Sequence, residues 1–485
     1  CDRCKTAVIF RATKQWFFKV EDLKKKMIAE NKKIKWQPKA AFNAFNSWLE
    51  NLRDNSITKQ RFWGTPIPIW RCNMCNNYDV IGSRAELKQL AGKLPKDLHK
   101  PFIDEITYKC DCGGEKTRLP DILDVWLDAG SASWNCLDYP QEEDRFKNLF
   151  PADFILEGND QIRGWFNLLM VASMITMEKI SFKSCYMHGM VNDAKGRKMS
   201  KSEGNYIIPE EVYKQYGVDT FRYYASGGAQ PALDLNYNIA DVKIKYRNLV
   251  ILWNVHNFLI ELCKNNKINP EKIKIEKKEL GREEQYIISK TNSTIRTVTD
   301  KLETLLLPEV PHLIEDLMLE LSRTYIQLTR DKASVGTARE KEIVAHTTYT
   351  VVMALLKLFA VVTPFITEKV YLNLKESFSL KEESIHLFDW PTFDETSIQV
   401  QLEKDFSLAS KVIQATLHAR EKAQIGVRWP LSHIRVATTN DNAQNSLERS
   451  KDIILQQTNI KELLIDDTFR DAKATVKADF KKLGP

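Results

Sequence analysis

The stretch Ser184–Asn205, SCYMHGMVNDAKGRKMSKSEGN, decides how the first half of this chain is expected to fold. It begins with an apolar run, which predicts a buried strand, and continues into the polar loop GRKMSKSEGN, which has no apolar run to bury. A helix-like stretch begins at Pro209, soon after the loop. In an open α/β sheet the strands deliver such loops at their carboxyl ends, where ligands collect. The stretch therefore predicts a sheet of this kind with a binding loop at its edge.

The composition of this loop indicates a negatively charged ligand. Lys198 and Lys201 would act as mobile ammonium groups that favour the charge growing on a phosphate chain as one of its bonds breaks. The other polar and flexible positions would donate hydrogen bonds and let the loop open and close: Ser200, Ser202, Gly196 and Gly204. An exposed turn can have a similar composition, so the complete pentapeptide KMSKS is the more specific signal.

The pattern of apolar residues changes near residue 240. Before it, the runs ILDVWLDAG (122–130) and DFILEGNDQ (153–161) look like buried strands that each lead into a loop. After it, helical periodicity dominates, and stretches at 241–266, 312–332 and 347–362 predict a helical bundle.

The end of the chain has a mixed pattern. A Lys-rich segment at 269–285 is expected to be exposed. The tail from about Gln399 begins as a helix and then alternates like a strand in WPLSHIRVATT (429–439).

Length and composition limit the class of protein. With 485 residues, 43% of them apolar, the chain should form two to four packed domains. The net charge of +7 permits an anionic partner without demanding one. The most apolar window, 350–365, contains Lys357 and Pro364, so it predicts a buried bundle helix and no membrane span. No signal peptide is visible, which favours a cytoplasmic location, and the first residue is not Met, so a piece of a longer protein is expected.

The nine cysteines include three close pairs, which predict zinc ligands. Two thiolates on a tight turn leave their sulfurs on the same side, and four would close a tetrahedral structural site. The second and third pairs supply these four ligands, Cys72, Cys75, Cys110 and Cys112, and the first pair, Cys1 and Cys4, is half a site. The isolated cysteines are expected to be small core residues: Cys136, Cys185 and Cys263.

The KMSKS loop and four other blocks resemble the class I aminoacyl-tRNA synthetases, and the isoleucyl-tRNA synthetase family in particular. The similarity covers about residues 1–430, and the blocks stand in the same order as in that family. They are ITKQRFWGTPIPIW (57–70), DVWLDAG (124–130), EGNDQIRGWF (157–166), HGMVNDAKGRKMSKSEGN (188–205) and ESIHLFDWP (383–391).

The resemblance implies an α/β fold and a division into domains. The chain would contain the second half of a Rossmann-type catalytic domain with a zinc knuckle, a helical anticodon-binding bundle and a small C-terminal α+β segment. The expected divisions are 1–50 for the end of an editing insertion and the return to the catalytic domain, 51–205 for the catalytic half with the knuckle at about 71–120, 206–240 for a stem-contact connection, 241–398 for the anticodon-binding domain and 399–485 for the C-terminal helix and α+β segment.

The resemblance also implies roles for single residues. Glu157 would bind the ammonium group of the amino acid, and Trp126 and Trp165 would wall an apolar pocket for its branched side chain. The remaining residues would contact the adenylate: Gly158, Asp160 and Gln161 by polar contacts, and His188, Gly189, Met190 and Met199 near the adenine.

The reaction that the resemblance implies is the ligation of isoleucine to tRNA(Ile). The carboxylate of isoleucine would attack the α-phosphate of ATP in line, while Mg²⁺, Lys198 and Lys201 meet the charge of the leaving pyrophosphate. The terminal hydroxyl of the tRNA would then displace AMP. No protein nucleophile is needed, because positioning and electrostatics supply the rate.

This chain also departs from the family pattern. It has DNSITKQRFWG where a DWCISRQRYWG-like block is usual, and Leu127 and Ala129 stand where the family has Phe and Ser. The family's HIGH block and its editing insertion do not occur in the sequence, and both are expected upstream of Cys1, in a missing N-terminal catalytic half.

Two alternatives remain open at this stage. The first is a valyl- or leucyl-type ligase, which shares the KMSKS loop and the zinc knuckles. The second is a non-catalytic tRNA-binding subunit of a split synthetase, which would grip tRNA through a basic surface near Lys243, Lys245 and Arg247.

Overall fold

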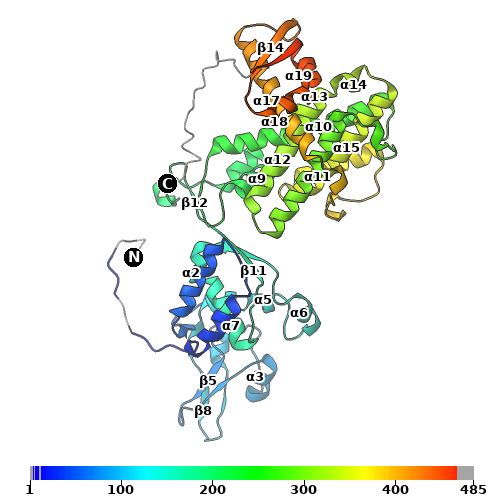
Figure 1. Ribbon diagram of the computed structural model, residues 1–485. Coiled ribbons are helices and arrows are strands. Elements are labelled where there is room, and N and C mark those ends of the chain that lie inside the picture. Colours follow the sequence, from blue (N-terminus) through cyan, green and yellow to red (C-terminus); the bar gives the residue numbers. More distant parts are fainter. Residues whose placement is uncertain (1–3, 5, 10–11, 467–485) are drawn as a thin grey trace. The chain divides into compact units, whose positions relative to one another are not determined.

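The computed structural model describes residues 4, 6–9 and 12–466. Its contacts divide the chain into two compact units (Figure 1). The first unit contains the described residues up to Val191 together with Gln230–Leu235, and the second contains Asn192–Ala229 and the described residues from Asn236 onward. The division therefore falls just before the KMSKS loop, which belongs to the second unit.

The first unit is built on a three-stranded parallel sheet. Its strands are β10 (Ile155–Gly158), β11 (Ser184–His188) and β2 (Lys35–Gln37), in the order β10-β11-β2. In the middle strand Cys185, Tyr186 and Met187 are all buried, as expected where both faces of a strand are covered. The predicted α/β sheet is confirmed.

Helices cover this sheet and share its core. They are α1 (Lys24–Asn31), α2 (Lys39–Glu50) and α7 (Trp165–Thr176). Helix α7 is apolar nearly all round and buried over most of its length, because it lies between the sheet and other elements. Trp36 of β2 packs against Phe45 of α2 and Phe166 of α7, so a strand and two helices meet in one aromatic cluster.

A four-stranded antiparallel sheet, which we call the knuckle sheet, is a further part of the first unit with a core of its own. Its order is β6-β5-β8-β7, and its elements are β5 (Ile69–Cys72), β6 (Tyr78–Val80), β7 (Thr107–Lys109) and β8 (Glu115–Arg118), with α3 (Arg84–Ala91) beside them. Trp70 is the buried centre of its small core, and its indole N–H donates to the carbonyl of Ile106 at 2.8 Å.

The strand predicted over residues 122–130 is wrong beyond Leu123. Only β9 (Ile122–Leu123) is extended, pairing with β4 (Thr58–Lys59), and the chain then forms helix α4 (Val125–Gly130). Asp124 begins this helix, because its carboxylate accepts the backbone N–H of Trp126 at 3.1 Å. Helix α4 packs closely on α7: a Cβ at Gly130 would lie 2.8 Å from the carbonyl oxygen of Leu168.

The second unit is a helical bundle, as the periodicity after residue 240 predicted. Its main helices are α8 (Pro209–Tyr216), α9 (Val218–Gly227), α10 (Ile239–Asn266), α11 (Arg282–Glu303), α12 (Val310–Glu320), α15 (Ala338–Phe359) and α16 (Pro364–Phe378). In the described part of the chain, α15 alone is long and apolar enough to cross a membrane, with a mean hydropathy of 1.3. Since 72% of that apolar window is buried inside the bundle, α15 is a core helix.

Two charged side chains of α9 fix the segment after the KMSKS loop to the bundle. Asp219 accepts the backbone N–H groups of Phe365 and Ile366 at the start of α16. Arg222 donates to the carbonyls of Val361 and Val362 just after α15. The Asp219 carboxylate therefore lies at the N-terminus of α16, and the Arg222 guanidinium lies at the C-terminal end of α15. Helix dipoles stabilise a negative charge at the first position and a positive charge at the second.

The last part of the second unit begins with a long helix, as predicted. It contains α17 (Val400–Lys422), β14 (Leu431–Ala437), α18 (Asp441–Arg449), α19 (Lys451–Thr458) and β15 (Ile460–Asp466), and β14 pairs with β15 in parallel. Shorter elements complete the two units: β1 (Phe17–Phe18), β3 (Asn55–Ser56), α5 (Ala132–Asn135), α6 (Glu143–Leu149), β12 (Val191–Asn192), β13 (Leu235–Asn236), α13 (Ile326–Leu328) and α14 (Arg330–Ser334).

A buried ion pair ties α17 to α18 and should make this region sensitive to acid. Asp405 is 2% exposed, and it accepts from Arg449 at 2.7 Å and from Ser446 at 2.7 Å. The Arg449 guanidinium beside it, helped by Ser446, lowers the pKa of Asp405 to about 2. Because the folded pKa lies below the unfolded value, the pair stabilises the fold fully above about pH 4 and stops doing so as the pH falls through about 2.

Asp405→Asn is therefore expected to lower the free energy of unfolding by about 2 kcal/mol at neutral pH. The difference from the wild type should shrink below about pH 4 and vanish near pH 2. Urea unfolding followed by circular dichroism at several pH values measures this. Asp452→Asn, which removes an exposed acid of α19 outside this pair, is the matched control. A constant difference across this pH range would contradict the assignment.

Candidate active site and metal centre

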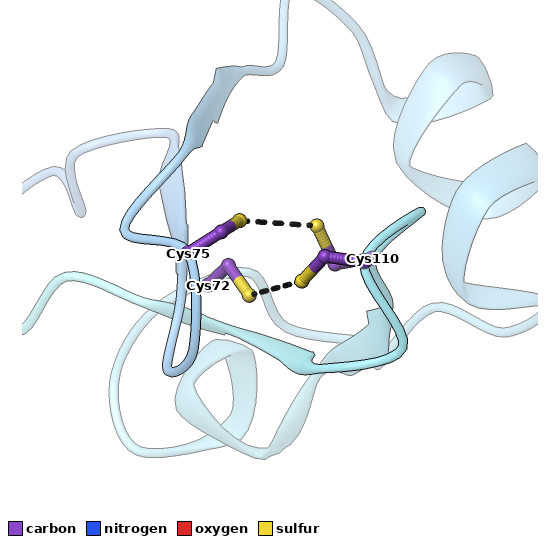
Figure 2. Close-up of side chains that lie close together, drawn as sticks. Cys72, Cys75 and Cys110 are labelled. Carbon is purple, nitrogen blue, oxygen red and sulfur yellow. Dashed lines mark hydrogen bonds between the residues drawn. The ribbon is translucent and has the colours of Figure 1, made fainter.

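Four cysteines meet at one end of the knuckle sheet (Figure 2). Cys72 and Cys75 lie at the turn after β5, and Cys110 and Cys112 lie at the turn between β7 and β8. Their sulfurs all lie within 4.8 Å of one another, with Cys72–Cys112 at 3.5 Å and Cys75–Cys110 at 3.7 Å. Sulfurs around a tetrahedral zinc ion lie about 3.8 Å apart for a Zn–S bond of about 2.3 Å, so the cluster fits such an ion.

The backbone around the cluster favours thiolates. The N–H groups of Cys75 and Met74 point toward the Cys72 sulfur and lower its pKa to about 6. The pKa of Cys75 is raised to about 12, because the neighbouring sulfurs outweigh the amide of Asn77 that stabilises its thiolate. The first thiolate therefore forms readily. Each further thiolate is repelled by the charge already present, unless a cation binds between the sulfurs. The cluster can bind a metal ion.

Glycine is required beside the cluster. A Cβ at Gly114 would lie 2.7 Å from the Cys72 sulfur, and Gly113 has a φ of +85°. The turn that presents Cys110 and Cys112 can therefore approach Cys72 only without a side chain at Gly114, whereas Gly113 supplies the left-handed backbone of the turn.

The other cysteines differ from one another. Cys185 and Cys263 are buried, as predicted, whereas Cys136 is exposed after the short helix α5, so its prediction as a core residue is wrong. Cys4 is exposed, and Cys1 lies outside the described residues, so the predicted half-site stays a prediction. Among the described residues, the four-cysteine cluster is the one group suited to hold a metal.

The predicted polar and adenine-contacting residues of the first unit lie at or just after the carboxyl ends of β10 and β11. In the parallel register Glu157 lies beside Met187 and Gly158 beside His188. Glu157 is half exposed, and its carboxylate lies 4.0 Å from the His188 ring. A Cβ at Gly158 would approach the Asp160 carboxylate to 2.6 Å and the His188 ring to 3.4 Å, so glycine keeps this edge open.

The turn after β10 is held by its own side chains. Gln161 donates to Asp160 at 2.9 Å and accepts the backbone N–H of Trp165 at 3.0 Å. The amide of Gln161 therefore orients the Asp160 carboxylate and at the same time caps the start of α7.

The two predicted tryptophans lie on neighbouring helices. Trp165 begins α7, and its indole N–H donates to the carbonyl of Ala129 in α4 at 2.9 Å. Trp126 of α4 remains 42% exposed, and a Cβ at Gly164 would lie 3.3 Å from its ring. The structure thus brings both rings to the region around Gly164.

The backbone after β11 is fixed by Gln230–Leu235, the second chain segment that belongs to the first unit. The N–H of Met190 donates to the Asp234 carboxylate at 2.7 Å, and its carbonyl accepts the N–H of Leu235 at 2.8 Å. Gly189 lies against the carbonyl of Leu233 so closely that a side chain would not fit. His188 donates from Nδ1 to the carbonyl of Gly189 at 2.6 Å.

In the second unit, the KMSKS loop is held at its base by Asp193 and Asn205. The Asp193 carboxylate accepts the backbone N–H groups of Lys195 and Arg197, the Arg197 guanidinium and the Asn205 amide. These donors hold the pKa of Asp193 well below its usual range, and the backbone N–H of Arg197 has the largest effect. Asn205 also donates to the carbonyl of Lys198 at 3.1 Å and accepts the N–H of Ser200 at 2.8 Å.

The bonds of Asp193 and Asn205 at the base of the loop were not predicted, although an acid and an amide at the two ends of the loop were a signal in the sequence. Lys198 and Lys201 are both exposed, and the Lys201 ammonium lies 5.4 Å from the centre of the Tyr206 ring. Met199 is partly buried between them. The loop thus has a fixed base and two accessible ammonium groups.

The predicted basic surface on α10 needs a correction. The Lys245 side chain is only 13% exposed and pairs with Glu315, and its ammonium lies 4.6 Å from the centre of the Tyr223 ring. The Lys245 ammonium is therefore paired inside the bundle and is largely shielded from solvent. Of the three predicted residues, Lys243 and Arg247 are exposed.

Comparisons with known proteins agree with this arrangement. Residues 3–238 match the family of class I tRNA synthetases (I, L, M and V), and residues 284–436 match the anticodon-binding domain of tRNA ligases. The isoleucine–tRNA ligase of Methanosarcina mazei is 37% identical over 100% of this chain and 47% of its own length. That of Methanothrix thermoacetophila is 39% identical over 96% of this chain and 44% of its own length.

Solved structures show the same fold at lower identity. LeuRS of Agrobacterium radiobacter K84, in a ternary complex with tRNA and LeuAMS, superposes with a TM-score of 0.56 at 22% identity, over 72% of this chain and 43% of that one. Methionyl-tRNA synthetase of Mycobacterium tuberculosis, in complex with methionyl-adenylate, superposes with a TM-score of 0.56 at 18% identity, over 79% of this chain and 68% of that one.

The parallel sheet and the helical bundle, together with these matches, are those of a class I aminoacyl-tRNA synthetase. The chain spans less than half the length of the curated relatives it matches, from 43% to 47%. Within the class, the chain belongs to the isoleucyl-tRNA synthetase family, as its sequence blocks predicted.

Proposed function

We propose that this chain supplies the KMSKS half of the active site and the tRNA-binding domain of an enzyme that ligates isoleucine to tRNA(Ile) through an isoleucyl-adenylate. The observation that carries the proposal is the meeting of Glu157, Gly158 and His188 at the carboxyl ends of β10 and β11. This is the edge of a parallel sheet where nucleotides bind, and glycine keeps it accessible.

The amino-acid part of the adenylate would lie beside Glu157. A half-exposed carboxylate at a strand end can accept an ammonium group by charge-assisted hydrogen bonds. Trp126 and Trp165 would bound the pocket for the branched side chain, where burial of methyl and methylene groups drives binding.

The nucleotide part would follow the turn after β10 and the backbone after β11. Asp160, oriented by Gln161, offers acceptors for the ribose hydroxyls. The backbone of His188, Gly189 and Met190, fixed by Asp234 and Leu235, would contact the adenine together with Met199.

The KMSKS loop would act on the pyrophosphate of ATP. As the isoleucine carboxylate attacks the α-phosphate, charge grows on the leaving pyrophosphate, and the ammonium groups of Lys198 and Lys201 stabilise it. Mg²⁺ bound with ATP would neutralise part of the same charge. Asp193 and Asn205 hold the base of the loop, so that only its tip has to move onto the substrate. The tRNA hydroxyl then displaces AMP.

The cysteine cluster would hold a structural zinc ion. Four thiolates fill a tetrahedral site and leave no position for a substrate, which separates a structural site from a catalytic one. Its function would be to stabilise the knuckle sheet, whose own core is small.

The domain roles implied by the resemblance are part of the proposal. Residues 51–205 would form the catalytic half, 206–240 the stem-contact connection and 241–398 the anticodon-binding domain. The bonds of Asp219 and Arg222 to the ends of α16 and α15 support a rigid link between the last two.

The chain alone is expected to be silent in adenylation and yet to bind tRNA. Its sequence contains no HIGH block, so ATP would meet the lysine loop without the opposing histidines and would not reach in-line geometry. The test measures ATP–pyrophosphate exchange with isoleucine by the 485-residue chain, before and after addition of a separately expressed N-terminal half. Exchange should appear only on mixing.

Binding of the tRNA(Ile) transcript by the chain alone, weakening steeply with salt, should accompany this result. Exchange by the chain alone would overturn the two-part active site. Exchange that never appears on mixing, with tRNA binding intact, would favour a non-catalytic tRNA-binding subunit.

A further inference from the structure

The loop Gln424–Pro430, between α17 and β14, is built on a buried arginine. Arg420 is 3% exposed, and its guanidinium donates to the carbonyls of Gly426 at 3.3 Å, Trp429 at 3.1 Å and Asn459 at 3.0 Å. No carboxylate pairs with Arg420 among the residues that the structure describes. Burial of a charge is costly unless hydrogen bonds compensate for it, and here the carbonyls of the loop and of Asn459 supply those bonds.

A second side chain fixes the same loop from the other side. Asn459 donates from its amide to the carbonyl of Val427 at 2.8 Å, and the N–H of Trp429 donates to the carbonyl of Gly426 at 3.1 Å. The carbonyls of Gly426, Val427 and Trp429 are therefore all bonded. This surface loop is preorganised by side chains outside it.

The loop presents an aromatic ring and a cation to solvent. Trp429 is 62% exposed, and the Arg428 guanidinium lies 6.0 Å from the centre of its ring. Val427 beside them is 44% exposed. A rigidly supported tryptophan next to a cation is suited to stack on a nucleic-acid base, because every base has a π-face and the cation meets the phosphate backbone.

The surface beside the loop has the matching charge. Lys422, Arg428 and Arg435 are exposed basic residues near the loop, and the exposed acids near them are Glu421 and, beside His433 on β15, Glu462. A groove of about 610 Å³ lies between α17 and β14, and Arg435, His433, Ala419 and Ala423 are among the residues that line it. Basic groups around an apolar groove fit single-stranded RNA better than they fit an acidic or neutral peptide.

We propose that Gln424–Pro430 is a stacking contact for an unpaired base of the tRNA anticodon loop. The match to the anticodon-binding domain extends to residue 436 and therefore includes the loop and nearly all of β14. The identity of the partner, tRNA, rests on the proposed function. In this proposal Trp429 stacks on the base, Arg428 contacts a phosphate, and Arg420 positions both residues.

The test uses the full chain with tRNA(Ile) transcripts that contain 2-aminopurine at single positions of the anticodon loop. Trp429→Ala should raise the Kd roughly 5- to 100-fold and remove the quenching of one labelled position, while Trp429→Phe should keep most of both. The dependence of Kd on salt should stay unchanged in Trp429→Ala and become shallower, by about one unit of slope, in Arg428→Ala.

Phe365→Ala, which removes another exposed aromatic ring of the second unit, is the matched control and should leave Kd unchanged. Thermal unfolding of each variant shows that the fold is intact. Arg420 bonds these carbonyls through two nitrogens of its planar fork, and the shorter single ammonium of Arg420→Lys does not reproduce that geometry, so this variant should weaken tRNA binding although both contact residues are present.

An unchanged Kd in Trp429→Ala would overturn the proposal, as would quenching of labels only outside the anticodon loop, or self-association of the chain through this groove. These outcomes leave the proposed function standing. Absence of tRNA binding by the wild-type chain would instead contradict the proposed function itself.

Discussion

Lys201→Ala is expected to slow isoleucine-dependent ATP–pyrophosphate exchange by roughly 100- to 1,000-fold in an enzyme that joins this chain to its N-terminal half. The ammonium of Lys201 is exposed on a loop whose base is fixed by Asp193 and Asn205. It would act on charge that exists only as pyrophosphate leaves, so its loss should lower kcat. The KM for isoleucine should change little, because the amino acid would be held by the end of β10 in the first unit.

Lys195→Ala is the matched control for this prediction. Lys195 is exposed and lies in the same segment, and it stands before the KMSKS pentapeptide. Its removal takes away the same charge from the loop region, so a general effect of net charge would appear in both variants. An exchange rate in Lys201→Ala equal to that of the control would mean that the loop does not act on the pyrophosphate.

Cys110→Ser is expected to abolish zinc binding and to loosen the knuckle sheet. Purified wild-type chain should contain about one equivalent of zinc, and the variant should contain none, because three thiolates and a hydroxyl form a much weaker site. The loss should reach beyond the metal, since Cys72 lies at the end of β5 and the cluster joins the turn between β5 and β6 to the turn between β7 and β8. Metal analysis measures the zinc, and limited proteolysis measures the exposure of the sheet.

Cys136→Ser, at an exposed cysteine outside the cluster, should keep both the zinc and the protease resistance. Removal of the metal from the wild type by a chelator should reproduce the proteolysis pattern of Cys110→Ser. A full equivalent of zinc in the double variant Cys72→Ser/Cys110→Ser would show that the metal binds elsewhere.

Several features of this protein follow from its sequence alone because they depend on neighbours in the chain. The apolar run before Gly189 forms β11, the 241–266 stretch lies within the single helix α10, and the apolar 350–365 window is a buried helix with Pro364 at the start of the next one. Close cysteine pairs bring two sulfurs together on one tight turn, so each pair was predictable by spacing, whereas the pairing of β5 with β8 brings the two pairs to one place. Local backbone preference and periodicity are sufficient for such features.

Other features were decided only by tertiary structure, because they depend on what packs against a residue. DVWLDAG forms a helix after Leu123 although Asp124 is a local cap signal, and its close packing on α7, which Gly130 permits, is a contact between distant segments. Lys245 looks like a surface cation in the sequence, but Glu315, far along the chain, takes it into the bundle.

The same applies to the strand β2 and to the loop around Trp429. Three residues, Lys35–Gln37, contain no strong strand signal, and they become part of the sheet because β11 offers its edge. Arg420 is one of many arginines in the sequence, and only the return of the chain at Asn459 makes it the centre of a rigid loop. Sequence therefore determines elements and clusters whose partners are near in the chain, whereas contacts between distant segments decide burial, pairing and the exact presentation of a side chain, because their energies exist only once the fold has formed.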